Sequence, residues 1–407
     1  MLPRPRTHNV WNILHSATTY HSTHKRPIVN SFNPDFKTLM GPGPSNIDPR
    51  VLQAMARPII GHLDPQFIGL MDDIKDLLRY AYQTENPLTF PVSAPGSAGM
   101  ETCFANLVEQ GDKVLVCING VFGGRMKENV IRCGGEAIIV EDEWGTPVSS
   151  DKVEAALQAH PDIKILAFVH AETSTGVCSD AATLARLAEK YGCLTIMDCV
   201  TSLAGIPVLI DEWGIDAAYS GSQKCLSCPP GLSPITFSPR AADVVRKRKT
   251  KVQSWFLDLS LVMDYWSGEG ARSYHHTAPI NSMYALHESL LLLKDEGLKN
   301  SWARHEIQHK FLKIGLENLG LSLLVDERFR LPQMNSVVIP DALREREGDI
   351  RKALLSKYNL EIGAGLGELA GKIWRIGLMG FGASEKNVET CIAALQSMLH
   401  DGLSSVS

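Results

Sequence analysis

The sequence predicts an α/β protein built on a mostly parallel sheet of seven strands. Short apolar runs alternate with segments of helical period along residues 88–237, and this alternation is typical of α/β folds. The apolar runs are continuous rather than interrupted at every second residue, which indicates a sheet covered on both faces. Seven runs are expected to be strands: Leu88–Val92, Lys113–Ile118, Glu136–Val140, Ile163–Val169, Leu194–Met197, Ala217–Ser220 and Pro234–Phe237.

The segments between these strands have the period of amphipathic helices. They are Met100–Glu109, Gly124–Arg132, Ser150–Ala159 and Ala181–Tyr191. Beyond about Tyr274 the pattern changes to two long helices, then to short strands mixed with further helices: Ser282–Lys294, Ser301–Leu319, Ser336–Ile339, Asp349–Tyr358, Glu361–Ile362, Lys372–Ile376 and Ser384–Leu399. We therefore expect a large domain over residues 35–295 and a smaller C-terminal α+β domain over residues 296–407.

Composition excludes several classes of protein. The 407 residues carry a net charge of -5, with 44% hydrophobic and 21% charged residues, which is typical of soluble globular proteins. The mildly acidic balance argues against nucleic acid as a partner, because phosphate binding depends on clustered positive charge. No apolar run approaches the roughly 18 residues that span a bilayer, so we expect no membrane partner.

The N-terminal segment, residues 1–34, differs from the rest of the chain. It contains no acidic residue, whereas four basic residues lie among several Ser, Thr and His: Arg4, Arg6, Lys25 and Arg26. This composition is typical of a mitochondrial transit peptide, so we expect an intracellular protein, in the mitochondrial matrix. The alternative is a tail without a targeting role, which would leave the cytoplasm or the peroxisome, although the C-terminus carries no Ser-Lys-Leu signal.

The nine cysteines are odd in number and lie mostly within apolar runs. They are expected to be reduced, buried thiols of an intracellular protein. Cys225 and Cys228 form a C-x-x-C pair, for which a redox pair or half of a zinc site is the alternative. Because no second pair and no His at metal spacing accompany it, we favour plain packing and expect no metal site.

An aspartate and a lysine carry the first sign of chemistry. Asp198 ends an apolar strand, where side chains of an open α/β sheet face the ligand crevice; the alternative is that it caps the turn that follows. Lys224 ends the small-residue turn YSGSQK, an unusual setting for a surface lysine. A partly desolvated lysine near other cations has a lowered pKa and can form a Schiff base.

This pair is what pyridoxal phosphate requires, because a lysine holds its aldehyde and an aspartate keeps its ring nitrogen protonated. The cofactor also needs a phosphate site, and the segment Val92–Glu101 (VSAPGSAGME) supplies small residues after a strand. Backbone N–H groups there can approach an anion, and a helix expected to begin near Gly99 adds its positive end. The segment is neither a Walker loop nor G-x-G-x-x-G, which disfavours a nucleotide.

Four blocks extend these signals over most of the chain. They are Gly41–Asn46 (GPGPSN), Tyr219–Lys224 (YSGSQK), Tyr274–Thr277 (YHHT) and Trp374–Gly377 (WRIG). With them the sequence resembles, from about Leu39 to His400, the class V aminotransferases of fold type I, and among these the alanine–glyoxylate and serine–pyruvate aminotransferases. The resemblance implies a fold type I pyridoxal-phosphate-dependent transferase that acts as a homodimer.

The resemblance also implies roles for individual residues. Lys224 would be the catalytic lysine that binds the cofactor, and Asp198 would pair with the pyridine nitrogen. Phe122 would stack on the cofactor ring, and the Thr173 hydroxyl would approach the ring oxygen, with Ser174 as a near competitor. The phosphate would be bound by Gly96, Ser97, Ala98 and Gln223, together with Tyr274 and Thr277 from the second subunit.

Arg375 is the candidate for holding the substrate carboxylate. Its guanidinium offers a bidentate fork, and it lies in an apolar strand where an unpaired charge would be costly. The alternative is an internal salt bridge, for example to Glu368. By resemblance, Pro42 and Gly43 would form a backbone wall beside the substrate.

The expected reaction moves the amino group of a small L-amino acid, alanine or serine, to glyoxylate or pyruvate by a ping-pong mechanism. One alternative is a different donor such as 3-hydroxykynurenine. A lyase or desulfurase is another, although a desulfurase would need a reactive cysteine on a mobile loop of the small domain, where the only cysteine is Cys391, in a helix-patterned segment. A non-catalytic binding protein is disfavoured by the intact set of Lys224, Asp198 and Arg375.

Overall fold

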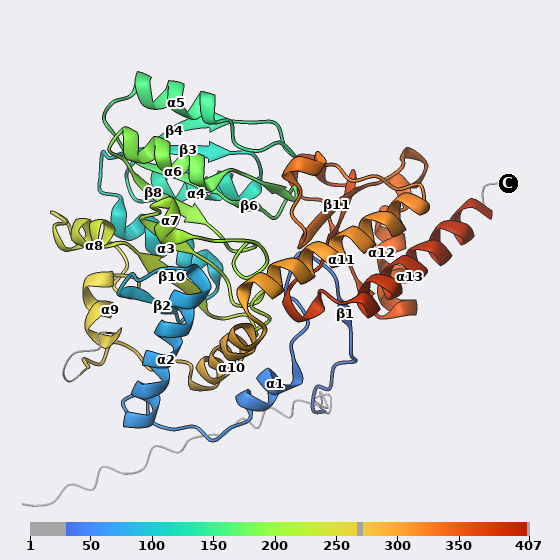
Figure 1. The fold of residues 1–407 in the computed structure, drawn as a ribbon, viewed down its shortest axis with the longest axis horizontal. Coiled ribbons are helices and arrows are strands. Elements are labelled where there is room, and N and C mark those ends of the chain that lie inside the picture. The colour runs from blue at the N-terminus through green and yellow to red at the C-terminus, as the bar shows by residue number, and fades with distance from the viewer. Residues whose placement is uncertain (1–29, 267–271, 405–407) are drawn as a thin grey trace, which may run out of the picture. The chain divides into compact units, whose positions relative to one another are not determined.

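A seven-stranded sheet forms the centre of the part of the chain that the structure describes, residues 30–266 and 272–404 of a computed structural model (Figure 1). Four neighbouring pairs are parallel, and one strand, β10, runs antiparallel to both of its neighbours. This confirms the predicted mostly parallel α/β sheet. In spatial order the strands are β2 (Leu88–Val92), β10 (Ser233–Phe237), β9 (Ala217–Tyr219), β8 (Leu194–Asp198), β5 (Ile163–Val169), β3 (Lys113–Ile118) and β4 (Glu136–Glu141).

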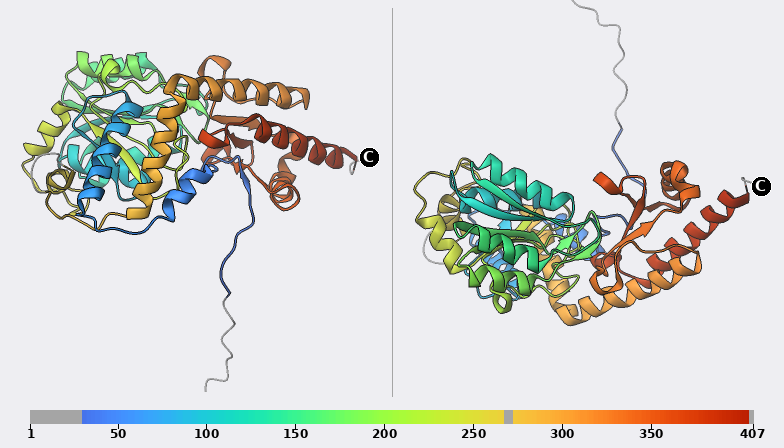
Figure 2. Two further views of the ribbon diagram at one scale, coloured as in Figure 1. Left: turned by 60° about the horizontal axis from the view of Figure 1, so that its bottom comes forward. Right: turned by 90° about the horizontal axis from the view of Figure 1, so that it is seen from above.

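Helices cover both faces of this sheet (Figure 2). Because the helices cover the strands from both sides, every residue of β8 and β10 is buried, which explains the apolar character of the sheet. The helices of this part are α1 (Pro49–Met55), α2 (Pro65–Tyr82), α3 (Gly96–Leu107), α4 (Val121–Arg132), α5 (Ser150–Ala159), α6 (Ala181–Lys190), α7 (Ile210–Trp213), α8 (Pro239–Arg246) and α9 (Leu259–Trp266). A small hairpin of β6 (Ala171–Glu172) and β7 (Val177–Cys178) follows β5.

A second hydrophobic core lies in the C-terminal part, around Trp374, Leu395 and Met40. Its three-stranded antiparallel sheet has the order β11-β14-β13. Helix α10 (Ile280–Glu296) packs against α1 and α2, and its buried apolar residues belong to the core around the large sheet. The elements that follow it are α11 (Leu298–Asn318), β11 (Met334–Val338), α12 (Glu347–Tyr358), β12 (Leu360–Glu361), β13 (Gly363–Ala364), β14 (Ile373–Gly377) and α13 (Glu385–Ser404), with short 3-10 turns η1 (Glu327–Phe329), η2 (Asp341–Arg346), η3 (Gly367–Leu369) and η4 (Gly380–Gly382).

One long-range pairing had no sequence signal. Strand β1 (Thr38–Leu39) pairs in parallel with β12, so the chain segment that precedes the large sheet is fixed to the C-terminal part. Residues from Lys37 onward form one compact unit. The predicted domain boundaries at 34/35 and 295/296 stay predictions, and so does the transit peptide, since residues 1–29 lie outside the described residues.

Two boundary predictions were wrong for physical reasons. The helix expected to begin near Gly99 begins at Gly96, because its small residues form the first helical turn instead of a loop. The single strand expected at Glu361–Ile362 is two strands, β12 and β13, which join different sheets on either side of Ile362. No helix in the described range is long and apolar enough to cross a bilayer. All nine cysteines are free, and Cys225 and Cys228 are both buried.

Candidate active site

Several of the predicted site residues lie at the carboxyl ends of neighbouring parallel strands. β8 ends at Asp198, and the register pairs this residue with Tyr219 at the end of β9. The turn that carries Lys224 follows directly. In an open α/β sheet this edge faces the ligand crevice, so the fold itself brings the aspartate and the lysine to one edge.

Asp198 is a buried carboxylate, 2% exposed, with both oxygens hydrogen-bonded. Oδ1 accepts from the backbone N–H of Val200 at 2.9 Å, and Oδ2 accepts from the Tyr219 hydroxyl at 2.8 Å. Capping of the following turn therefore accounts for one oxygen only. Burial raises the pKa of Asp198 to about 7, against the lowering effect of these hydrogen bonds and of Lys224.

Lys224 is partly buried, and its amine points into the site. Burial, followed by the nearby positive charge of Arg375, lowers the pKa of Lys224 to about 8. Nζ donates to the backbone carbonyl of Pro42. Gly43, with a φ of +101°, lies beside this amine, and a Cβ there would be 2.6 Å from Nζ. Glycine at this position thus leaves room for the lysine head group.

Arg375 enters the site from β14 of the C-terminal sheet and is 6% exposed. Nε donates to the carbonyl of Ala364 at 2.7 Å, and Nη1 donates to the carbonyl of Thr173 at 3.2 Å. Within the described residues no carboxylate pairs with this guanidinium, so the alternative of an internal salt bridge to Glu368 is not realised. Burial lowers the pKa of Arg375 to about 10. A charged fork with unused donors suits a carboxylate ligand.

The predicted phosphate site lies at the N-terminus of α3. Pro95 precedes this helix and makes no side-chain capping bond, so the first N–H groups of the helix have no capping side chain. Gly96 is buried, and a Cβ there would lie 3.5 Å from the carbonyl oxygen of Ser220. Ser97 is exposed and Ala98 is half-buried.

Gln223 adds a second observation that fits an anion. Its Oε1 is buried and has no hydrogen-bond partner in the described chain, and a Cβ on Gly221 would lie 2.9 Å from it. Since the two ends of an amide exchange by a half-turn, this side chain can offer N–H donors instead. Pyridoxal phosphate fits these groups. The uncapped start of α3 and the Gln223 amide suit its phosphate, the buried carboxylate of Asp198 suits its ring nitrogen, and the desolvated amine of Lys224 suits its aldehyde.

Thr173 and Phe122 lie on two separate segments. Thr173 is buried, with its hydroxyl oxygen 2.5 Å from that of Thr201. Phe122 is half-buried near the start of α4, and the guanidinium of Arg125 lies 4.8 Å from its ring centroid. The Ser174 hydroxyl oxygen accepts from the N–H of Val121 at 3.0 Å.

The structure does not connect Tyr274 and Thr277 with the other predicted site residues of the same chain. Both are exposed, Tyr274 at 61%, and the Tyr274 ring contacts the His62 ring with centroids 5.0 Å apart. Sequence reasoning also missed two contributors that the site uses, the phenol of Tyr219 and the hydroxyl of Thr201. Only Tyr219 had a signal, because it ends the strand next to Asp198. Pro42 was predicted as a site residue, and its carbonyl accepts from the lysine amine.

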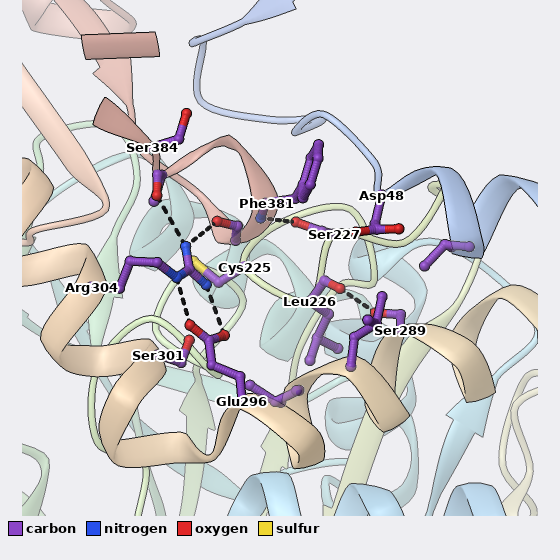
Figure 3. Close-up of a pocket in the computed structure, with 15 residues that line it drawn as sticks. Asp48, Cys225, Leu226, Ser227, Ser289, Glu296, Ser301, Arg304, Phe381 and Ser384 are labelled. Carbon is purple, nitrogen blue, oxygen red and sulfur yellow. Dashed lines mark hydrogen bonds and ion pairs between the residues drawn. The ribbon is translucent and has the colours of Figure 1, made fainter. Parts of the chain in front are cut away.

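A cavity of about 320 Å³ lies behind the turn that follows Lys224 (Figure 3). Cys225, Leu226 and Ser227 line it, together with residues of α1, α10, α11 and η4. Arg304 on α11 binds both carboxylate oxygens of Glu296, at 2.6 and 2.9 Å, and donates to the carbonyls of Gly380 and Ala383 at the two ends of η4. None of the predicted site residues lines this cavity, so it is separate from the active site.

Comparison with known proteins agrees with this geometry. The model of the family "Aminotransferase class-V" matches residues 39–368. The alanine–glyoxylate aminotransferase of Oryctolagus cuniculus is 41% identical over 365 residues, which cover 89% of this chain and 92% of the relative. The (S)-ureidoglycine–glyoxylate transaminase of Bacillus subtilis (strain 168) is 37% identical over 383 residues, covering 89% and 90%.

The fold agrees as well. The crystal structure of an alanine–glyoxylate aminotransferase from Nostoc sp. has a TM-score of 0.89 and 46% identity, covering 92% of this chain and 98% of that one. The match of the family model and these identities over most of both chains show that the protein belongs to the class-V aminotransferase family, and it is a pyridoxal-phosphate-dependent aminotransferase.

Proposed function

We propose that this aminotransferase moves the amino group of L-alanine, or of L-serine, to glyoxylate, with pyruvate as an alternative acceptor. The observation that carries the proposal is the convergence of a desolvated amine (Lys224), a buried carboxylate (Asp198) and an unpaired guanidinium (Arg375) at one edge of the sheet. Glyoxylate is common to the names of the relatives compared above, which supports it as the acceptor.

Pyridoxal phosphate, when bound, supplies an aldehyde for the amino group and a protonated ring that delocalises the electron pair left at the α-carbon. Lys224 would hold it through the amine, Asp198 through the ring nitrogen, and Gly96, Ser97, Ala98 and Gln223 through the phosphate. The Phe122 ring and the Thr173 hydroxyl would contact the ring.

Lys224 is the proton carrier of the proposed mechanism. With its pKa lowered to about 8, a sizeable fraction of the amine is neutral near neutral pH, and only the neutral amine takes up a proton. Nζ would remove the proton from the substrate α-carbon and return it later in the cycle. The carbonyl of Pro42, to which Nζ donates, orients the amine between these steps.

Arg375 would bind the substrate carboxylate and set its orientation. The carbonyls of Ala364 and Thr173 fix the guanidinium plane, so a carboxylate meets a pre-oriented fork. Pro42 and Gly43 would close the site beside it. Lys224 and Arg375 both have a role in this mechanism, so neither is available to bind a second carboxylate of the donor.

Other activities receive less support. 3-Hydroxykynurenine and (S)-ureidoglycine stay alternative donors, since the described site does not distinguish among neutral side chains. A desulfurase is disfavoured, because Cys391 is fully buried in α13 and burial raises its pKa to about 12.

We also propose a homodimer as the active form. Tyr274 and Thr277 are exposed in the single chain. In a dimer, these two residues of one subunit would reach the cofactor phosphate that is bound in the other subunit. Exposed apolar side chains nearby in the sequence, such as Trp255 at 62%, are consistent with a contact surface.

A half-reaction assay tests the activity directly. L-Alanine alone is expected to shift the visible absorbance of the cofactor-loaded protein, and alanine with glyoxylate to yield pyruvate and glycine. Lys224→Ala is expected to reduce the rate at least about a hundredfold, because the proton carrier is lost. A panel with L-serine, 3-hydroxykynurenine and (S)-ureidoglycine identifies the donor. A wild-type protein that binds the cofactor and transfers no amino group from L-alanine or L-serine to glyoxylate or pyruvate would refute the proposal.

The carboxylate site is tested by Arg375→Lys. A lysine cannot reproduce the bidentate fork, so kcat/KM for L-alanine is expected to fall about 10–100-fold. Ethylamine, which is alanine's closest analogue without a carboxylate, serves as the matched substrate. The kcat/KM for ethylamine, which is already low, should change little. The ratio of kcat/KM for alanine to that for ethylamine should therefore fall by the same factor, about 10–100-fold. An equal loss for both amines would show that Arg375 acts on something other than the carboxylate.

The ring site is tested by Tyr219→Phe. This change removes the donor to Asp198 Oδ2, so the pKa of Asp198 rises above its present value of about 7. Only the ionised carboxylate attracts a cationic ring nitrogen. The affinity for pyridoxamine phosphate, which lacks an aldehyde, should therefore be lost as pH falls through a midpoint roughly 0.5–1 unit higher than in the wild type.

Tyr82→Phe is the matched control for this titration. Tyr82 is also fully buried, and its hydroxyl donates to the carbonyl of Pro234 at 2.8 Å. Binding titrations across neutral pH should give the wild-type midpoint for this variant. If Tyr219→Phe also keeps the wild-type midpoint, the hydrogen bond has no part in tuning Asp198.

A further inference from the structure

Glu172 is a fully buried carboxylate for which neither the sequence nor the proposed mechanism has a role. It ends β6 and is 0% exposed. No cation pairs with it within the described residues, and burial raises its pKa against the lowering effect of its hydrogen bonds. Burying an acidic group without a counter-ion is costly unless several donors compensate. The donors around Glu172 therefore indicate what the side chain does.

These donors come from two segments that are distant in sequence. Oε1 accepts from the backbone N–H of Ser174 at 3.0 Å and from its hydroxyl at 2.5 Å. Oε2 accepts from the backbone N–H of Phe122 at 3.2 Å. The Ser174 hydroxyl oxygen accepts in turn from Val121. One carboxylate thus joins the turn after β6 to the first turn of α4.

These hydrogen bonds replace the missing N-terminal cap of α4. Gly120 is the residue before α4 and offers no side chain to its first N–H groups. Glu172 and Ser174 satisfy them from the neighbouring segment instead. A Cβ on Gly120 would collide with the Glu172 side chain and would lie 2.6 Å from Ser174 Oγ. The absence of a side chain at position 120 is what lets the carboxylate reach the helix.

The two joined segments carry groups assigned to the cofactor ring. Phe122, whose N–H binds Glu172, is the proposed stacking residue. Thr173, between Glu172 and Ser174, is the proposed partner of the ring oxygen, and its carbonyl accepts from Arg375. The negative charge of Glu172 also raises the pKa of Arg375 against the effect of burial. Glu172 therefore contacts, or acts electrostatically on, the segments that carry two proposed ring contacts and the proposed carboxylate-binding residue.

We propose that Glu172 is a positioning residue for the cofactor, which fixes the Phe122 ring and the Thr173 hydroxyl at the distance and angle that the bound ring requires. The inference deepens the proposed function, because it rests on the roles given there to Phe122 and Thr173. It goes beyond a helix cap, since a cap alone would stabilise α4 without affecting the ring site.

Glu172→Gln tests this with little change of shape. One oxygen becomes an NH₂ group that faces N–H donors, so one side of the join is lost. Titration of the apoprotein with pyridoxal phosphate should give a Kd about tenfold or more higher than in the wild type. The visible circular dichroism of the bound cofactor, which reports the ring's orientation, should weaken. Ser174→Ala, which removes the bridging hydroxyl, should shift both readouts in the same direction.

Asp216→Asn is the control at a buried carboxylate outside the ring site. Asp216 is 4% exposed and accepts from the backbone N–H of Thr195 at 3.0 Å, and unlike Glu172 it is paired with a cation, Arg240. Asp216 directly precedes β9, so it lies at the amino ends of the parallel strands, whereas Asp198 lies at their carboxyl ends. This variant should lose stability to denaturant while its Kd for pyridoxal phosphate changes less than about twofold.

A double-mutant cycle separates positioning from general loosening. If Glu172 acts through the aromatic ring, Phe122→Ala should weaken cofactor binding, and adding Glu172→Gln should weaken it by much less than in the wild-type background. Wild-type Kd and circular dichroism in both Glu172→Gln and Ser174→Ala would overturn the inference and leave the proposed function intact. An unchanged Kd for Phe122→Ala alone would overturn the stacking role, and the inference with it.

Discussion

Burial drives the two central groups of the active site toward their neutral forms. It lowers the pKa of Lys224 to about 8 and raises that of Asp198 to about 7. A neutral amine can bind an aldehyde or take up a proton. A carboxylate that is poised near neutrality is readily ionised by a cationic ring placed opposite it. The chemistry therefore depends on keeping water away from both groups while leaving room for the cofactor between them.

Three parts of the chain maintain this arrangement. Parallel strands β8 and β9 bring Asp198 and the lysine turn to one edge. The segment between β1 and α1 holds the lysine turn in place, since the Ser45 hydroxyl donates to the carbonyl of Lys224 at 2.9 Å. The C-terminal part contributes Arg375 and also the N–H of Phe381, which donates to Ser227 at 2.7 Å. The pairing of β1 with β12 fixes the segment that contains Ser45 to the C-terminal part.

Sequence reasoning succeeded where a pattern is local. Continuous apolar runs predict β5 and β8, and a strand-end aspartate with a lysine in a small-residue turn predicts the chemistry. It failed where a contact depends on packing. Nothing local marks Glu172 as the cap of a helix some 50 residues earlier in the chain. The first turn of α3 was missed because glycine and serine, poor helix formers, are favoured there by tertiary contacts.

Covalent attachment is the central claim, and it can be measured without any substrate. The cofactor-loaded protein is reduced with borohydride, digested, and mapped by mass spectrometry. The account predicts one modified lysine, at position 224, and an unmodified protein after Lys224→Ala. Modification at a different lysine, or an intact Lys224 peptide in a protein that has bound the cofactor, would contradict it.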